Sequence, residues 1–232
     1  ASGNRGVSRF DGETFVNYGA DAGPLARQIT NVLQDRHGRI WAGGVRGLSV
    51  YDGDHFVDLP EGLIPHAFVV HVLEDDAGIL WISTWGGGIV RTDGEVYQTL
   101  QSADGLISDA TQEVLQANDG TYWIATEDGV THYTPRAGQP TLRLTNVIVQ
   151  RELGPVDSVA ISTAQERITF EFQGGSLRTR PGHMLYLYRL NANDEWQQTR
   201  DDQASFVGLP RGEYNFEVVA VDRDLNRSEP VT

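Results

Sequence analysis

The sequence predicts an all-β protein with two domains, a partial β-propeller over residues 1–140 and a β-sandwich over residues 141–232. A segment of about 40 residues recurs three times in the first part of the chain, and a repeat of that length is typical of propeller blades. Near residue 143 the repeat stops and longer, alternating strands begin. The change of pattern separates the two domains.

The three copies of the repeat align on Trp41, Trp81 and Trp123, which are 40 and 42 residues apart. Each copy offers an apolar strand, a tryptophan strand and a glycine-led strand, and the first two copies add a fourth strand marked by an aromatic residue. Short strands separated by Asp-Gly turns form a blade. The expected strands lie at 32–33, 40–42, 48–51 and 56–57, at 72–73, 80–82, 89–92 and 96–97, and at 114–115, 122–124 and 130–133.

The chain opens inside a repeat, because GVSRFDGETF from Gly6 to Phe15 parallels GLSVYDGDHF from Gly47 to Phe56. With this half-blade the sequence predicts about three and a half four-stranded blades. Such an arc leaves a sheet face without a neighbour at each end. Either further blades that this sequence does not include cover these faces, or a second copy of the chain does. We therefore expect the ends of the arc to contact a second chain or to end in disorder, so self-association is expected.

Asp35 and Asp75 stand a few residues before the turn glycines of the first two copies. An aspartate at this place can accept hydrogen bonds from the backbone N–H groups of its own turn. The third copy has Ala117 there, which a calcium loop would not tolerate easily, so no metal site is predicted. The tryptophans are expected to be wedges between neighbouring blades, because one large aromatic per repeat suits packing of sheet on sheet.

After residue 143, strand-like runs lie at 144–149, 167–172, 184–190 and 214–221. In the last run, apolar residues at 214, 216, 218 and 220 alternate with mostly polar ones, which predicts one apolar face. Turns rich in glycine, proline and asparagine separate the runs. This pattern predicts a sandwich of about 90 residues, and the prolines and glycine of residues 134–141 mark the boundary.

The composition excludes several functions. The formal net charge is −14, and residues 1–140 hold 8 arginines against 19 acidic residues, whereas residues 141–232 hold 10 against 13. A field of this sign repels phosphate backbones, so nucleic acid is not an expected partner. The absence of cysteine rules out disulfides, thiolate metal sites and cysteine nucleophiles. No apolar run of membrane-spanning length is present in the sequence.

Positions that vary within a constant repeat are those that the scaffold does not fix. Ten residues before the tryptophans stand Asn31, His71 and Glu113, and five residues after them stand Arg46, Gly86 and Asp128, with Trp85 one place earlier in the second copy. Loops and inner strand ends of a propeller converge near its axis. The predicted ligand-binding residues are therefore Trp85, Arg46, His71, Asn31, Glu113 and Asp128, and ordinary solvated loop residues are the alternative interpretation.

Trp85 stands out among these residues, because a large aromatic followed by three glycines has few local packing partners. Its ring could stack on a sugar or another planar ligand. No catalytic residue and no cofactor are predicted, since the six histidines are scattered and no nucleophile motif is present.

The segments VLQDRHGRIWAGGVRGLSVYDG and VLEDDAGILWISTWGGGIVRTDG resemble the two-component regulator propeller repeat. Residues 143–232, with YLYRL, GLP, GEY and VVAVD, resemble the three-Y domain that follows such propellers. The resemblance implies an immunoglobulin-like sandwich and a periplasmic, extracytoplasmic sensor region of a bacterial inner-membrane protein. The propeller would receive a small molecule or oligosaccharide and the sandwich would pass the signal to a transmembrane helix beyond Thr232. A histidine kinase or diguanylate cyclase would respond inside the cell.

Relatives of this kind carry many more blades than the sequence shows. A propeller enzyme, a lyase or hydrolase that acts on a small molecule or polysaccharide, is the alternative function. A gene that continues into a transmembrane helix and a cytoplasmic signalling domain would favour the sensor.

Overall fold

The structure, a computed structural model, describes residues 2–3, 6–19, 28–60, 62–65, 68–161, 167–180 and 182–232. The chain divides into two compact units, Ala1–Pro135 and Arg136–Thr232. Within the described residues the strands form six antiparallel sheets, and the only helix is a single 3-10 turn at Ser102–Asp104. The all-β prediction is confirmed. In the same residues, no helix has the length and apolar character needed to span a bilayer.

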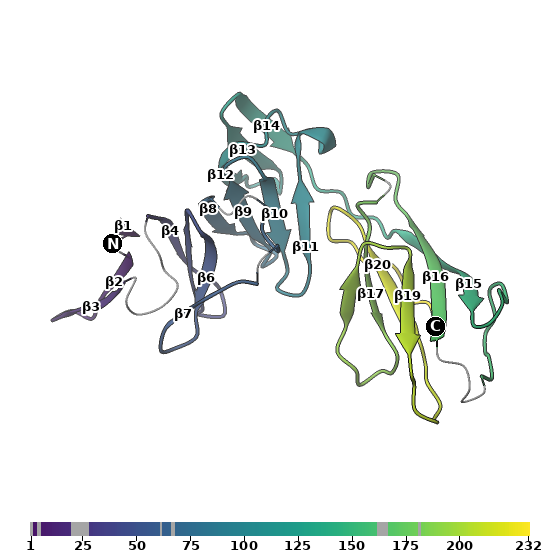
Figure 1. Cartoon of the computed structure of the whole chain (residues 1–232). Coiled ribbons are helices and arrows are strands. Elements are labelled where there is room, and N and C mark those ends of the chain that lie inside the picture. The colour runs from purple at the N-terminus through teal and green to yellow at the C-terminus, as the bar shows by residue number, and fades with distance from the viewer. Residues whose placement is uncertain are drawn as a thin grey trace. The chain divides into compact units, whose positions relative to one another are not determined.

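Four sheets follow one another along the first unit (Figure 1), and we call them the half-blade and blades 1, 2 and 3. The half-blade contains β1 (Ser2–Gly3), β2 (Gly6–Phe10) and β3 (Phe15–Tyr18). Blade 1 contains β4 (Ile29–Gln34), β5 (Ile40–Gly44), β6 (Gly47–Tyr51) and β7 (Phe56–Asp58). Blade 2 contains β8 (Val69–Glu74), β9 (Leu80–Thr84), β10 (Gly88–Thr92) and β11 (Tyr97–Leu100). Blade 3 contains β12 (Thr111–Gln116), β13 (Tyr122–Thr126) and β14 (Gly129–Tyr133).

The hairpin between the first two strands of each blade turns at a glycine in the left-handed region, with φ of 86° at Gly78 of blade 2. In this hairpin Asp75 Oδ1 accepts hydrogen bonds from the backbone N–H groups of Ala77 and Ile79, both at 2.9 Å. Asp35 does the same in blade 1. The predicted role of the two aspartates in their turns is confirmed.

The second oxygen of each aspartate makes a bond that the sequence did not predict. Asp75 Oδ2 accepts a hydrogen bond from Trp81 Nε1 at 2.8 Å and another from the Tyr122 hydroxyl of blade 3 at 2.7 Å. Burial raises the pKa of Tyr122, and the hydrogen bond to Asp75 raises it further. The aspartate therefore joins its own turn, its own tryptophan and the next blade.

Asp35 binds the indole of Trp41 in the same way, with a distance of 2.8 Å from Nε1 to Oδ2. Burial opposes the ionisation of Asp35, but hydrogen bonds from Trp41 and Arg39 outweigh it and hold the pKa of this carboxyl below its usual value. Blade 3 has Ala117 in place of the aspartate, so Trp123 has no such carboxylate in its own turn.

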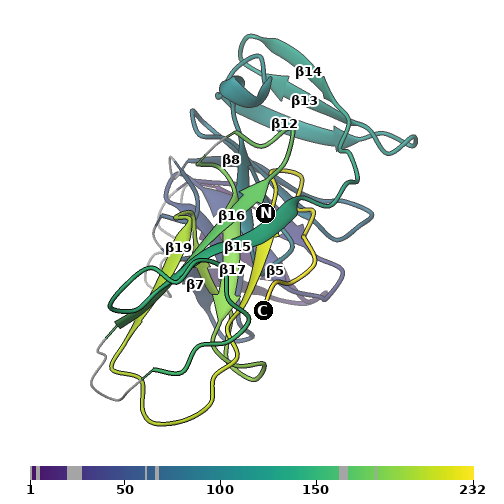
Figure 2. The same ribbon diagram turned by 90° about the vertical axis from the view of Figure 1, so that its right-hand side faces the viewer.

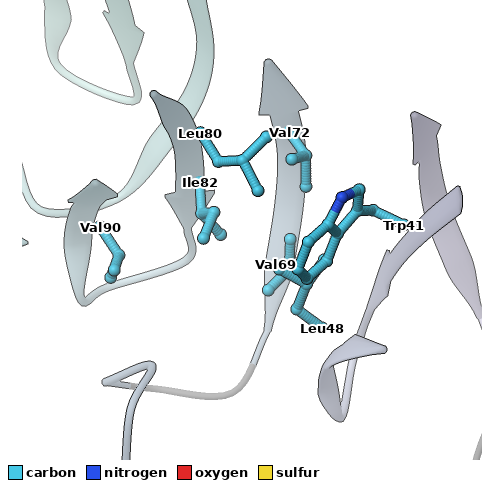
Figure 3. Close-up of a cluster of buried hydrophobic side chains, with 7 residues drawn as sticks. All are labelled: Trp41, Leu48, Val69, Val72, Leu80, Ile82 and Val90. Atoms are coloured by element: carbon cyan, nitrogen blue, oxygen red, sulfur yellow. The ribbon is translucent and has the colours of Figure 1, made fainter. Parts of the chain in front are cut away.

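Neighbouring blades pack through opposite faces, which we call trailing and leading. Figure 3 shows Trp41 and Leu48 on the trailing face of blade 1 against the leading face of blade 2, whose side chains there are Val69, Val72, Leu80, Ile82 and Val90. Trp81 and Ile89 of blade 2 pack in the same way against blade 3. Trp41 and Trp81 are only 5% and 2% exposed, which confirms that they are wedges between blades. The same prediction is wrong for Trp123, which is 47% exposed and belongs to no buried cluster of the described residues.

The second unit is a sandwich of two three-stranded sheets (Figures 1 and 2), so the second part of the predicted fold is also confirmed. One sheet contains β15 (Thr141–Ile148), β16 (Arg167–Gly175) and β19 (Gln203–Val207); the other contains β18 (Gln197–Thr199), β17 (Leu185–Arg189) and β20 (Glu217–Val221). The rings of Phe170 and Phe216 stack in the core at 4.0 Å. The Tyr214 hydroxyl donates to the Pro210 carbonyl at 2.9 Å, as in the tyrosine corner of immunoglobulin-like domains.

The sandwich differs from the predicted pattern in two places. β18 and β19 were not predicted, because they are short and carry few apolar residues. The last strand begins at Glu217 rather than at residue 214, and Val219 and Val221, on its other face, are buried as well. The alternation of one apolar and one polar face therefore does not extend over the whole run.

Candidate ligand-binding site at one end of the blades

The first strand of each blade contains a β-bulge at the same place. In β8 the pairing with β9 shifts by one residue between Val69 and His71. The same shift precedes Asn31 in β4 and Glu113 in β12. A bulge changes the direction of the side chain beside it, so these three residues occupy equivalent, locally irregular positions.

The first strands of successive blades are neighbours, with β4 beside β8 and β8 beside β12. Thr30 Oγ1 in β4 donates a hydrogen bond to the Val69 carbonyl of β8 at 2.6 Å. The Glu113 carboxylate in β12 is close enough to His71 to act on its ionisation. The structure therefore places three of the predicted residues, Asn31, His71 and Glu113, on adjacent strands at matching heights.

His71 is half-buried, and burial lowers the pKa of its imidazole while the Glu113 carboxylate partly opposes this effect. Its Nδ1 atom is buried and has no hydrogen-bond partner among the described residues. The same is true of Asn31 Oδ1 and of Ser83 Oγ, and Ser83 lies opposite His71 in β9. These three buried polar atoms thus have unused capacity for hydrogen bonds, which water or a polar ligand can satisfy.

The depressed pKa of His71 predicts a pH-dependent stability. The unfolded chain takes up a proton near the ordinary value of 6.5, whereas the folded chain takes it up only at lower pH. The contribution of His71 to the free energy of unfolding is therefore complete above pH 6.5 and lost as pH falls from there through the folded pKa. In urea unfolding, the free energy of unfolding should fall less between about pH 7.5 and about pH 5 for His71→Gln than for the wild type.

The exposed His37 provides the control for this measurement, because His37→Gln should retain the pH dependence of the wild type. Equal losses of stability in His71→Gln and the wild type would contradict the prediction.

Arg46, Trp85 and Asp128 lie in or beside the hairpins between the second and third strands. Because the strands are antiparallel, these hairpins lie at the end of each blade where the first strand begins, close to the bulges. We call this end the loop end. All six predicted residues lie at the loop end of their blades.

A pocket of about 730 Å³ opens beside Arg46, within the size range of small-molecule sites. Its wall includes the apolar side chains of Leu48, Leu59, Ile64 and Pro65, and Asp58 adds a carboxylate. Arg46 is exposed, so its guanidinium can contact a ligand in the pocket. The sequence predicted Arg46 but none of the other lining residues. Leu48 and Asp58 lie in β6 and β7 of blade 1, and the rest of the wall named here lies in the irregular connection between blades 1 and 2.

Trp85 is close to this pocket through its own hairpin. A Cβ atom on Gly87 would lie only 2.4 Å from the Pro65 carbonyl oxygen, so the hairpin approaches the pocket wall at a distance that only glycine permits. The Trp85 side chain remains 45% exposed. Its ring lies 6.4 Å from that of Phe68, a neighbour that the sequence did not reveal.

Glu113 and Asp128 are both exposed in blade 3, and neither lines the pocket beside Arg46. The structure thus gathers Arg46 and the Trp85 hairpin around one pocket, and it aligns Asn31, His71 and Glu113 along the first strands. Asp128 stands apart from both groups. In the described part of the chain, no three histidine or acidic side chains are arranged to hold a metal ion.

Comparison with protein families gives two matches. Residues 63–86 match the two component regulator propeller family, and residues 179–232 match the Y_Y_Y domain. The matched propeller repeat spans β8 and β9 and includes His71 and Trp85, and the matched part of the Y_Y_Y domain spans β17 to β20. No curated protein sequence matches the chain.

Several solved structures are similar in fold. An extracellular domain assigned to a hybrid two component system of B. thetaiotaomicron is 18% identical, with a TM-score of 0.45 over 94% of this chain and 34% of its own. A second such domain from that organism is 14% identical, with a TM-score of 0.44 over 98% of this chain and 54% of its own. A catalytically inactive virginiamycin B lyase of Staphylococcus aureus is 10% identical, with a TM-score of 0.40 over 97% of this chain and 94% of its own. The chain therefore spans about a third and about half of the two extracellular domains.

Proposed function

We propose that this chain is the extracytoplasmic sensor region of a bacterial transmembrane signalling protein of the histidine kinase or diguanylate cyclase type. The observation that carries the proposal is the succession of a two component regulator propeller repeat at residues 63–86 and a Y_Y_Y domain at residues 179–232 in one chain. In this proposal the region lies in the periplasm, binds its signal without chemical conversion, and the Y_Y_Y domain relays the bound state towards the membrane.

The loop end of the blades is the proposed binding surface, and its ligand is a small molecule or an oligosaccharide. Arg46 supplies a cationic, hydrogen-bonding group beside a pocket that is partly lined by apolar side chains, and Trp85 supplies an open ring face. His71 and Asn31 bring polar atoms that have no hydrogen-bond partner among the residues that the structure describes. A few placed polar groups beside an apolar wall are the usual composition of a small-molecule site.

A thermal-shift screen with neutral oligosaccharides and small carboxylates tests this proposal. A compound present at a hundredfold excess over its dissociation constant should stabilise the folded chain by about 2.7 kcal/mol, which appears as a higher melting temperature. Arg46→Ala and Trp85→Ala should each weaken the shift given by that compound. Exposed residues of the second unit provide matched controls, and Arg211→Ala and Leu177→Ala should leave the shift unchanged. A shift that survives both site substitutions would place the ligand elsewhere.

A further inference from the structure

The apolar wall of the pocket beside Arg46 continues the core between blades 1 and 2. Leu48 belongs to the buried cluster between these blades, and Leu59 and Ile64 pack against the same cluster. Contact with that cluster holds the three branched side chains in place. The lining residues that the structure describes belong to blade 1 and to its connection with blade 2, so the pocket does not depend on the first or the last sheet of the unit.

Two side chains of opposite charge line this pocket without pairing with each other. Asp58 lies opposite Ser49 in β7 and β6, and its Oδ1 atom accepts a hydrogen bond from the buried Ser49 hydroxyl at 2.5 Å. Among the contacts of the described residues, the Arg46 guanidinium has no hydrogen bond or ion pair, and Asp58 Oδ2 accepts none. Ser49 therefore fixes the carboxylate, while its second oxygen and the guanidinium keep their capacity to bind a ligand.

The distance between the two charged residues corresponds to a short peptide. Arg46 precedes Ser49 by three residues, and each strand residue rises by about 3.3 Å, so the two positions are about 10 Å apart along the strand. Asp58 marks one end of this distance because it is the cross-strand neighbour of Ser49. An extended dipeptide covers about 7 Å, and the long Arg46 side chain can cover the remainder.

We propose that this pocket binds a short apolar peptide with free ends, whose carboxylate contacts Arg46 and whose ammonium group contacts Asp58. This inference rests on the proposed function, because it assigns a class of ligand to the loop end. The forked guanidinium matches a carboxylate, and the branched side chains of Leu48, Leu59 and Ile64 match apolar side chains. None of the lining residues that the structure describes has an aromatic ring on which a sugar could stack.

The charge of the propeller unit favours a zwitterion over a simple anion. Residues 1–140 hold 19 acidic residues against 8 arginines, so their field repels a ligand with a net negative charge. A peptide with two free ends has no net charge and is not repelled. A ligand that carried only a carboxylate would also leave Asp58 in the same pocket without a cationic partner.

Isothermal titration calorimetry of the whole chain with three matched peptides tests the contact at each end. L-leucyl-L-leucine has both charges, its N-acetyl form lacks the ammonium group, and its C-terminal amide lacks the carboxylate. The free dipeptide should bind, and each blocked form should bind more than about tenfold more weakly, because a charge-assisted hydrogen bond is lost. Equal binding of the three peptides, or no binding of the free dipeptide at about 1 mM, would overturn the inference.

Two substitutions assign the ends of the peptide. In Arg46→Gln the free dipeptide and its amide should bind equally, and in Asp58→Asn the free dipeptide and its N-acetyl form should bind equally. Asparagine keeps an oxygen that can accept the Ser49 hydroxyl bond, so Asp58→Asn should retain the melting temperature of the wild type without ligand. Arg211→Gln is the matched control, because Arg211 is exposed in the second unit, and it should bind all three peptides as the wild type does.

The results distinguish a failure of this inference from a failure of the proposed binding surface. A thermal shift given by an oligosaccharide and abolished by Arg46→Ala and Trp85→Ala, with no binding of the dipeptide, would overturn the peptide ligand and support the loop end as the binding surface. Dipeptide binding that neither Arg46→Gln nor Asp58→Asn changes would overturn both, because the peptide would then bind away from the loop end.

Discussion

Replacement of Trp81 by alanine is expected to lower the free energy of unfolding of the propeller unit by about 3–5 kcal/mol. The Trp81 side chain is almost completely buried between blades 2 and 3 and stacks on Tyr122, with ring centroids 4.1 Å apart. The Arg91 guanidinium lies 5.0 Å from the centre of the indole on the same blade. The substitution therefore leaves a cavity at an interface and removes the indole donor from the buried Asp75.

Trp123→Ala is the matched control, because Trp123 has the same place in the repeat but is about half exposed, and Ala117 stands where blade 2 has Asp75. In urea unfolding, Trp123→Ala should lower the free energy of unfolding by less than about 1.5 kcal/mol. Similar costs for the two substitutions would show that the interface between blades 2 and 3 contributes little to stability.

Asp75→Ala is expected to destabilise the propeller unit by about 2–4 kcal/mol. The carboxylate accepts four hydrogen bonds, from the backbone N–H groups of Ala77 and Ile79 and from the side chains of Trp81 and Tyr122. An alanine leaves these donors without an acceptor, and those of Trp81 and Tyr122 are buried at the interface between the blades. The free energy of unfolding lost in Asp75→Ala should therefore exceed the loss caused by replacing an ordinary turn residue.

Tyr122→Phe separates the contact between blades from the turn itself. The substitution removes one of the four donors to Asp75. It should lower the free energy of unfolding by about 1–2 kcal/mol, which is well below the loss expected for Asp75→Ala. Asp119→Ala controls for a turn aspartate of blade 3, since Asp119 is exposed and bonds only within its own turn in the described contacts, and it should change stability little. Equal effects of Asp75→Ala and Asp119→Ala would contradict the role of Asp75 across the interface.

The repeat made most of the propeller predictable. Local features, such as the turn glycines and the short apolar runs, recur at fixed distances from each tryptophan, and the observed strands of blades 1 and 2 lie where those features place them. The sandwich was less predictable, because β18 and β19 form by pairing with distant strands rather than from a strong local pattern. Edge strands of this kind need few apolar residues, so their sequences resemble loops.

The candidate site was predictable only as a set of positions. The repeat frame singled out Asn31, His71 and Glu113 as variable, and the structure places them at equivalent bulges on neighbouring strands. The pocket beside Arg46 was not predictable, because part of its wall comes from the connection between blades 1 and 2, which has no counterpart pattern in the repeat.

The sequence by itself determined the class of fold, the number of repeats and the turn chemistry, because these depend on residues that are close together in the chain. Only the tertiary structure decided which apolar residues are buried. Trp81 and Trp123 have the same local sequence setting, yet one is enclosed by the next blade and the other is open to solvent. The difference arises because burial depends on the sheet that packs against a face, and no local pattern specifies whether that sheet is present.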